Sequence, residues 1–197
     1  MKPTPMLLAV LTALYEAPMH PYQLHQILIE RGKDLIAEVK PGSIYHAVQR
    51  LEKYGLAEEL ETSRDGRRPE RTTYRITDAG RTACLEWIEG MIARPKAEYP
   101  QFLAGIASMA ALGPDVAERS LRERAEALEN EIARHRADLE QNGSFLPRVV
   151  LVETEYLIAV RTAELTWARG IIADLRSGAL HWDEAMLRRI LDQRESP

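Results

Sequence analysis

Polar and basic side chains recur at helical spacing between residues 43 and 53 of this 197-residue sequence. Ile44, Val48 and Leu51 are apolar at spacings of four and three, which predicts a helix with one buried face. The opposite face carries Ser43, Tyr45, His46, Gln49, Arg50 and Lys53. Glutamine can address adenine, arginine and lysine can address guanine or phosphate, and tyrosine and serine often contact phosphate. Considered alone, this pattern also fits an ordinary solvated helix face.

A second group of residues suited to recognition is the arginine-rich segment from Arg64 to Arg75. It holds five arginines against Asp65 and Glu70, a local net charge of +3 in a chain whose net charge is −4. Arginines at such density neutralise phosphates, which supply most of the affinity of a protein for DNA. The alternative is a solvated loop whose charge is incidental. The order of the surrounding elements favours DNA contact over that alternative.

Three helices and two strands are expected to position these two groups. The helices are predicted at residues 6–16, from Pro21 to the cap residue Gly32, and at 41–54, which is the candidate recognition helix. Apolar residues then alternate with a period of two, which predicts strands at 56–62 and 72–76. The sequence therefore predicts a winged helix-turn-helix, with the loop 63–71 as the tip of its wing.

A fourth helix completes this domain, and the rest of the chain is predicted to be helical. Thr77 resembles a helix N-cap, and Arg94-Pro95-Lys96 is the expected boundary between a DNA-binding domain at 1–95 and an all-helical domain at 96–197. In the second domain we expect one helix at residues 99–112 and a following helix that ends near residue 142. A long helix is then expected from residue 147 to about 175, and a short tail helix around Trp182, Met186 and Ile190. The overall fold class is mainly α.

One helix of the second domain has a coiled-coil-like seam, which requires a partner. The seam consists of Leu121, Ala125, Leu128, Ile132, His135 and Leu139, at alternating spacings of four and three. The partner is either a neighbouring helix of the same chain or a second subunit. A separate stripe of Tyr156, Val160, Ala163, Trp167 and Ile171 is expected to form part of a core or an interface rather than a ligand pocket.

Composition and motifs argue against an enzyme. The sequence has no phosphate-binding or dinucleotide-binding glycine motif, no nucleophile elbow and no Cys/His cluster, so we expect neither a cofactor nor a metal. The single cysteine, Cys84, is expected to be a buried structural thiol, as suits a reducing cytoplasm. No apolar run approaches the roughly 20 residues of a membrane span. The net charge is zero for residues 1–95 and −4 for residues 96–197.

Three segments together resemble the PadR family of transcriptional regulators. They are HPYQL at 20–24, KPGSIYHAVQRLEKYGL at 40–56 and GRRPERTTYRITDAG at 66–80, and the resemblance covers about the first 95 residues. Pro21 stands where the family usually has glycine, and His46 where it usually has proline. Neither difference threatens the fold, and we expect His46 to offer a base or phosphate contact that the family pattern does not imply.

The resemblance implies a transcription factor, usually a repressor, that binds an inverted repeat of double-stranded DNA as a homodimer. It implies dimerisation through the C-terminal helices, with a second subunit against the seam, and in some members a response to a small-molecule effector. Carried over to this sequence, it implies DNA contacts by Tyr22, Ser43, Tyr45, Gln49, Arg67, Arg68 and Arg71. We add Lys40, the first residue of the second segment, and Arg64, which precedes the third segment, to these contacts. The alternative function is a winged-helix protein-interaction module, with the acidic second half as its docking surface.

Overall fold

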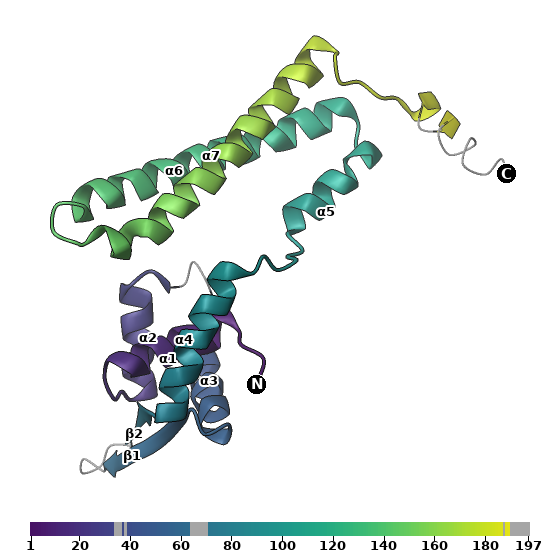
Figure 1. Cartoon of the computed structure of the whole chain (residues 1–197). Helices are drawn as coiled ribbons and strands as arrows, with labels where there is room; N and C mark the ends of the chain where they lie inside the picture. Colours follow the sequence, from purple (N-terminus) through teal and green to yellow (C-terminus); the bar gives the residue numbers. More distant parts are fainter. Residues whose placement is uncertain (34–36, 38, 64–70, 187, 190–197) are drawn as a thin grey trace. The chain divides into compact units, whose positions relative to one another are not determined.

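The computed structural model describes residues 1–33, 37, 39–63, 71–186 and 188–189. It divides into two compact units, Met1–Ala97 and Glu98–Pro197 (Figure 1). Among the helices of the described residues, none is long and apolar enough to cross a membrane.

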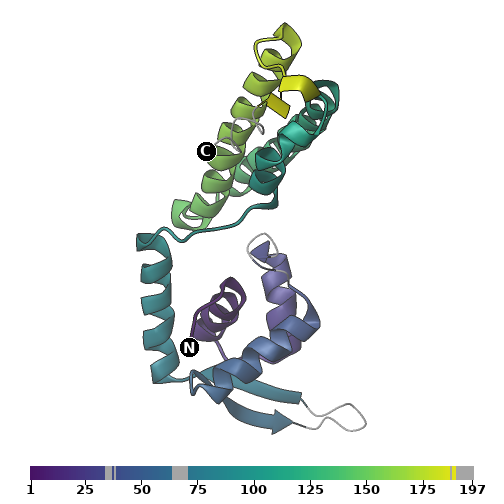
Figure 2. The ribbon, with the colours of Figure 1, turned by 90° about the vertical axis from the view of Figure 1, so that its right-hand side faces the viewer.

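Within its described residues, the first unit contains four α-helices and one two-stranded antiparallel sheet. The elements are α1 (Pro5–Glu16), α2 (Pro21–Glu30), α3 (Pro41–Lys53), β1 (Ala57–Ser63), β2 (Arg71–Ile76) and α4 (Asp78–Ala93). Figure 2 shows α1 between α4 on one side and α2 and α3 on the other. This is a winged helix-turn-helix, as the sequence predicts.

Local sequence signals explain where the helices begin and end. Each of α1, α2 and α3 has a proline in its first turn, where the missing N–H costs nothing. Gly32 and Gly55 follow α2 and α3 with positive φ angles of 65° and 69°, the left-handed conformation that glycine adopts without strain. The Thr77 hydroxyl accepts a hydrogen bond from the Gly80 N–H at 3.0 Å and so caps α4.

Helix α1 supplies the centre of the hydrophobic core. Its residues Leu7, Val10, Leu11 and Leu14 are at most 1% exposed, and the apolar residues of the other helices pack with them in one cluster. The core members from α2 and α3 are Leu24, Leu28, Ile44, Ala47, Val48 and Leu51. The predicted apolar face of α3 is therefore confirmed.

The wing hairpin is joined to the helices by its second strand. The side chains of Tyr74 and Ile76 are buried against the core, while that of Arg75 is exposed. The Met19 N–H donates to the Tyr74 carbonyl at 2.9 Å and the Tyr74 N–H donates to the Met19 carbonyl at 3.0 Å. This pairing of β2 with the α1–α2 connection was not evident from the sequence. The register shifts between Glu59 and Glu61, leaving Leu60 as the extra residue of a bulge.

The second unit is built around a long helical hairpin. Its elements are α5 (Gln101–Ala107), the 3-10 helix η2 (Met109–Ala111), α6 (Pro114–Asn142) and α7 (Arg148–Ser177). The prediction of one helix over residues 99–112 is wrong, because the Ser108 N–H bonds to the Gly105 carbonyl and tightens the chain into a 3-10 turn there. The tail prediction is confirmed only in part, since Ile190 lies outside the described residues.

The seam of α6 packs against α7 of the same chain. Leu121, Ala125, Leu128 and Ile132 form one cluster with Leu165 and Ile172. Ion pairs reinforce the hairpin, because Arg161 bridges Glu131 at 3.0 Å on α6 and Glu164 at 3.5 Å on its own helix. For these four residues the partner is the neighbouring helix of the same chain, which is one of the two alternatives, and not the second subunit that the resemblance implies. His135 and Leu139, at the end of the seam, are half-buried and lie outside this cluster.

Gly80 lies where the fold leaves no room for a side chain. A Cβ built there would stand 2.0 Å from the Leu56 carbonyl oxygen and 2.7 Å from Cγ1 of Ile76. The same carbonyl accepts the Thr77 N–H at 3.1 Å, so it cannot retreat without loss of that bond. Gly90, on the same helix, has nothing within 4 Å of its built Cβ.

We predict that Gly80→Ala destabilises the protein and that Gly90→Ala does not. Overpacking against backbone costs about 1–3 kcal/mol, whereas an alanine in place of an open helical glycine stabilises by about 0.4–1 kcal/mol. Urea unfolding followed by circular dichroism measures both changes. Equal midpoints for the two variants would contradict the close approach of α4 to Leu56.

Candidate nucleic-acid interface

One face of α3 is free of core contacts and carries the predicted recognition residues. Burial of Ile44, Val48 and Leu51 turns the opposite side of the helix outward. Five of the predicted residues on α3 are exposed and Ser43 is half-buried; the exposed ones are Tyr45, His46, Gln49, Arg50 and Lys53. The structure thus brings together side chains that can address both base edges and phosphates.

The start of α3 presents backbone donors as well as side chains. Its N-cap residue is the exposed Lys40, and in the part of the chain that the structure describes no side chain caps this helix. Pro41 has no N–H, so the amides of Gly42 and Ser43 are the first donors of the helix. Together with the positive end of the helix dipole, they favour an anion at this end.

Helix α2 begins differently, because a histidine caps it. The His20 Nδ1 atom accepts the Tyr22 N–H at 3.0 Å, and the His20 N–H donates to Oε1 of Gln23 at 2.9 Å. This reciprocal capping box was missed in the sequence because histidine is not among the usual N-cap residues. Tyr22 follows in the first turn and is 59% exposed, so its phenol ring lies in solvent.

A buried tyrosine connects the recognition helix with the base of the wing. The Tyr74 hydroxyl donates to Oε1 of Glu59 at 3.5 Å. Burial raises the pKa of Tyr74 above its ordinary value, and the negative charges of Glu52 and Glu59 raise it further. The phenol therefore stays protonated and remains a hydrogen-bond donor at neutral pH. Glu52 belongs to α3 and Glu59 to β1, so negative charges on both elements act on the phenol.

The arginine-rich wing is described only at its base. Arg64, Arg67 and Arg68 lie outside the described residues, as does the side chain of Arg71. The side chain of Arg75 is described, and its Nε donates to Oε1 of Glu58 at 2.7 Å. One of the five arginines counted from the sequence is thus already paired. The cross-strand register that places Arg75 opposite Glu58 is a tertiary feature that the charge count missed.

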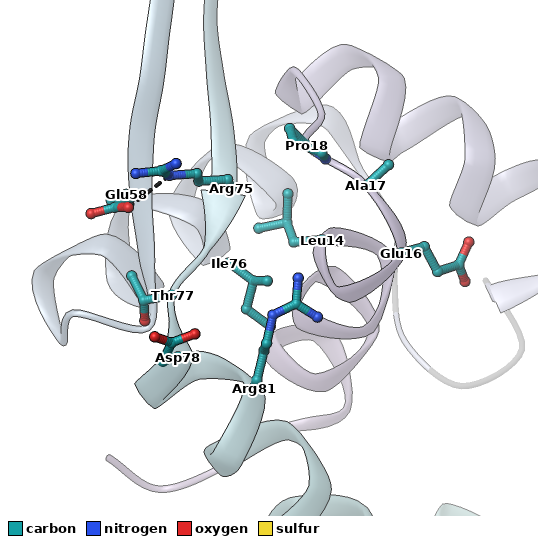
Figure 3. A pocket seen from close by; sticks show the side chains of 10 residues that line it. All are labelled: Leu14, Glu16, Ala17, Pro18, Glu58, Arg75, Ile76, Thr77, Asp78 and Arg81. Carbon is teal, nitrogen blue, oxygen red and sulfur yellow. Dashed lines mark hydrogen bonds and ion pairs between the residues drawn. The ribbon is translucent and has the colours of Figure 1, made fainter.

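The first unit also has a polar hollow on another surface. It has a volume of about 550 Å³ and lies between the end of α1, the base of the hairpin and the start of α4 (Figure 3). The Arg81 guanidinium lies over the Tyr15 ring at 4.8 Å and donates to the Tyr15 carbonyl at 3.4 Å. Three of the charged residues that line the hollow, Arg81, Glu58 and Arg75, are therefore engaged in contacts within the fold.

The single cysteine and the potential metal ligands of the described residues form no metal-binding cluster. Cys84 is 1% exposed, and its sulfur lies 3.7 Å from the Thr12 hydroxyl, as expected for a structural thiol. Across the described ranges, no three His, Cys, Asp or Glu side chains are placed to hold a metal ion.

Comparisons with known proteins agree with this fold. Residues 10–86 match the model of the transcriptional regulator PadR-like family, which is a family of regulators and not of enzymes. No curated relative matches the sequence.

Several solved structures share the architecture of most of the chain. The Bacillus subtilis PadR in complex with operator DNA has 18% identity and a TM-score of 0.66, covering 86% of this chain and 98% of that one. The same protein in complex with p-coumaric acid has 14% identity and a TM-score of 0.69, with coverages of 87% and 99%. The PadR-like regulator BC1756 from Bacillus cereus has 18% identity and a TM-score of 0.62, with coverages of 88% and 99%. At these identities the likeness shows the fold.

Proposed function

We propose that this chain, whose N-terminal unit is a PadR-like winged-helix domain, is a transcriptional regulator that binds operator DNA as a homodimer. The observation that carries the proposal is the outward face of α3. This face presents the exposed side chains of Gln49, Arg50 and Lys53, and among the described residues no side chain caps the N-terminus of the helix. A helix of this width fits the major groove of B-form DNA, where base pairs present distinct donors and acceptors.

The groups of the interface take different parts in this proposal. Gln49 and Arg50 contact base edges in the major groove, while Ser43, Tyr45, His46 and Lys53 contact bases or phosphates around them. Tyr22 and Lys40 approach the phosphate backbone from the starts of α2 and α3. The wing, residues 63–71, follows the minor groove or the backbone with Arg64, Arg67, Arg68 and Arg71.

The second unit supplies the contact between two copies. The side of α7 that faces away from α6 is apolar yet exposed: Val149, Val152, Tyr156, Val160 and Trp167 are 40–76% exposed. With the exposed Ala159, Ala163 and Gly170 they follow one stripe along the helix. Such a stripe in an otherwise folded unit indicates a missing partner. We propose that α7 of a second chain covers it about a two-fold axis.

Pairing of two copies also suits the geometry of DNA. Consecutive major-groove sites on one side of the helix lie about 34 Å apart, so two recognition helices must be held at a set distance. A symmetric dimer then selects an inverted repeat. We propose that the regulator acts as a repressor in the cytoplasm. A small-molecule effector that favours one arrangement of the two subunits would change its affinity for the operator.

The test of this function is direct binding to the DNA upstream of the gene. Fluorescence anisotropy with that fragment and a scrambled control is measured over a salt series. We expect tighter binding to the upstream fragment, and a loss of about 1,000-fold or more in affinity between about 50 and about 200 mM salt if six or more phosphates are neutralised. Absence of binding to both fragments at low salt would favour a protein-interaction module instead. The acidic strand β1, with Glu58, Glu59 and Glu61, would suit that alternative.

Two sets of substitutions separate base reading from phosphate binding. Gln49→Ala is expected to lower affinity for the preferred sequence by about 1–3 kcal/mol and to relax the preference at one position, with little change on scrambled DNA. The double variant Arg67→Ala/Arg68→Ala is expected to weaken binding to both fragments and to reduce the salt slope by about one for each phosphate that is no longer neutralised. The same anisotropy series measures both variants. An unchanged sequence preference would exclude Gln49 from base reading, and an unchanged salt slope would exclude the arginine pair from phosphate binding.

The proposed dimer surface is tested by placing charged side chains in the apolar stripe of α7. In Tyr156→Glu/Val160→Glu, two carboxylates stand in the apolar stripe, so burial against a second copy becomes unfavourable. We expect light scattering after size exclusion to give twice the mass of one chain for the wild type and one chain for the variant. Operator affinity is expected to fall by about 100-fold, because each half-site must then be bound separately. Ala137→Glu, at an exposed position of α6, is the control and should remain dimeric.

A further inference from the structure

The first turn of α2 presents polar side chains outward, those of Tyr22 and Gln23. Two of its N–H groups are engaged, because the Tyr22 N–H donates to Nδ1 of His20 at 3.0 Å and the Leu24 N–H donates to the His20 carbonyl at 3.0 Å. Pro21 has no N–H to offer. An anion approaching this turn therefore meets side-chain donors, of which the Tyr22 hydroxyl is one, whereas the start of α3 offers backbone amides.

The Tyr22 hydroxyl is held by a residue one helical turn away. The Gln26 side-chain amide donates to it from Nε2 at 3.3 Å, and both side chains are exposed. Residues four apart in a helix lie on the same face, so the pair is set by the helix itself. A phenol has one proton and two acceptor sites. With one acceptor site occupied by Gln26, the hydroxyl proton points away from the amide.

We propose that Gln26 is a positioning residue, which orients the Tyr22 hydroxyl so that it donates to a DNA phosphate. The proposal rests on the DNA-binding function put forward above. The first helix of a helix-turn-helix crosses the phosphate backbone, and phosphate oxygens only accept hydrogen bonds. The amide that donates to the phenol oxygen also polarises the O–H bond, which strengthens its donation to the anion.

Whether removal of Gln26 weakens or tightens DNA binding depends on which of the two side chains donates the hydrogen bond between Gln26 and Tyr22. If the phenol instead donated to the Gln26 carbonyl oxygen, removal of Gln26 would release the proton and tighten DNA binding. With the amide as donor, its removal leaves the hydroxyl free to rotate and weakens binding. Gln26 has no effect when residue 22 has no hydroxyl. The two side chains are therefore energetically coupled in a way that a residue with a purely structural role is not.

A double-mutant cycle tests the proposal with the full chain. Wild type, Tyr22→Phe, Gln26→Leu and the double variant are titrated on the upstream fragment and on scrambled DNA. We expect Tyr22→Phe to lose about tenfold in affinity on both, as for a hydrogen bond to a charged acceptor. Gln26→Leu should lose about threefold on both, and the double variant should be no weaker than Tyr22→Phe. Gln141→Leu, at an exposed glutamine of α6, is the matched control and should bind like wild type.

Several outcomes would overturn the proposal while leaving the DNA-binding function intact. Losses that add in the double variant would mean that Gln26 acts independently of Tyr22. Unchanged or tighter binding by Gln26→Leu would mean that the amide does not support the donor. Lower helicity of Gln26→Leu by circular dichroism, with the same loss in the Tyr22→Phe background, would assign it a structural role. Failure of the wild type to bind either fragment would overturn the proposed function as well.

Discussion

Burial of one face of α3 against α1 is the constraint on which the candidate interface depends. Ile44, Val48 and Leu51 are at most 1% exposed and pack in the same cluster as Leu11 and Leu14 of α1. Because a helix is rigid, this burial also decides which side chains point outward. The same helix therefore stabilises the unit with one face and presents donors and acceptors with the other. A larger apolar residue on the outward face would leave the core intact and remove recognition chemistry, so stability and function occupy separate faces.

Charge is organised locally rather than over the whole chain. The net charge is −4, yet α3 ends in Arg50 and Lys53, and the wing segment is rich in arginine. Two acidic side chains at the base of the wing have partners: Glu58 pairs with Arg75, and Glu59 accepts from Tyr74. The positive charge of Arg75 lowers the repulsion that the Glu58 carboxylate would exert on phosphates. An acidic protein with a neutral first half can in this way still offer a surface to a polyanion.

In the second unit, the hairpin of α6 and α7 has two separate sets of apolar residues. The seam of α6 is satisfied within the chain, and the ion pairs of Arg161 with Glu131 and Glu164 support the same contact. Helix α7 carries a second apolar stripe on its opposite side, which its own unit leaves exposed. One helix that is apolar on two sides can join the hairpin on one side and a second copy on the other. The T-shaped contact of Phe102 with Trp167 shows that α5 covers part of this second stripe, at its Trp167 end.

The sequence alone determined the features that depend on neighbours in the chain. Prolines and glycines set the limits of α2 and α3, Thr77 identified the start of α4, and apolar spacing identified the buried face of α3. The set of outward-facing residues on α3 followed directly, because the position of the buried face fixes which side chains lie on the opposite face. The tertiary structure decided what depends on residues far apart. Which helix covers the α6 seam, the pairing of Arg75 with Glu58 and the crowding of Gly80 by Leu56 each involve partners brought together by folding. Periodicity shows that a face must be buried, but the identity of the element that buries it depends on how the chain closes on itself.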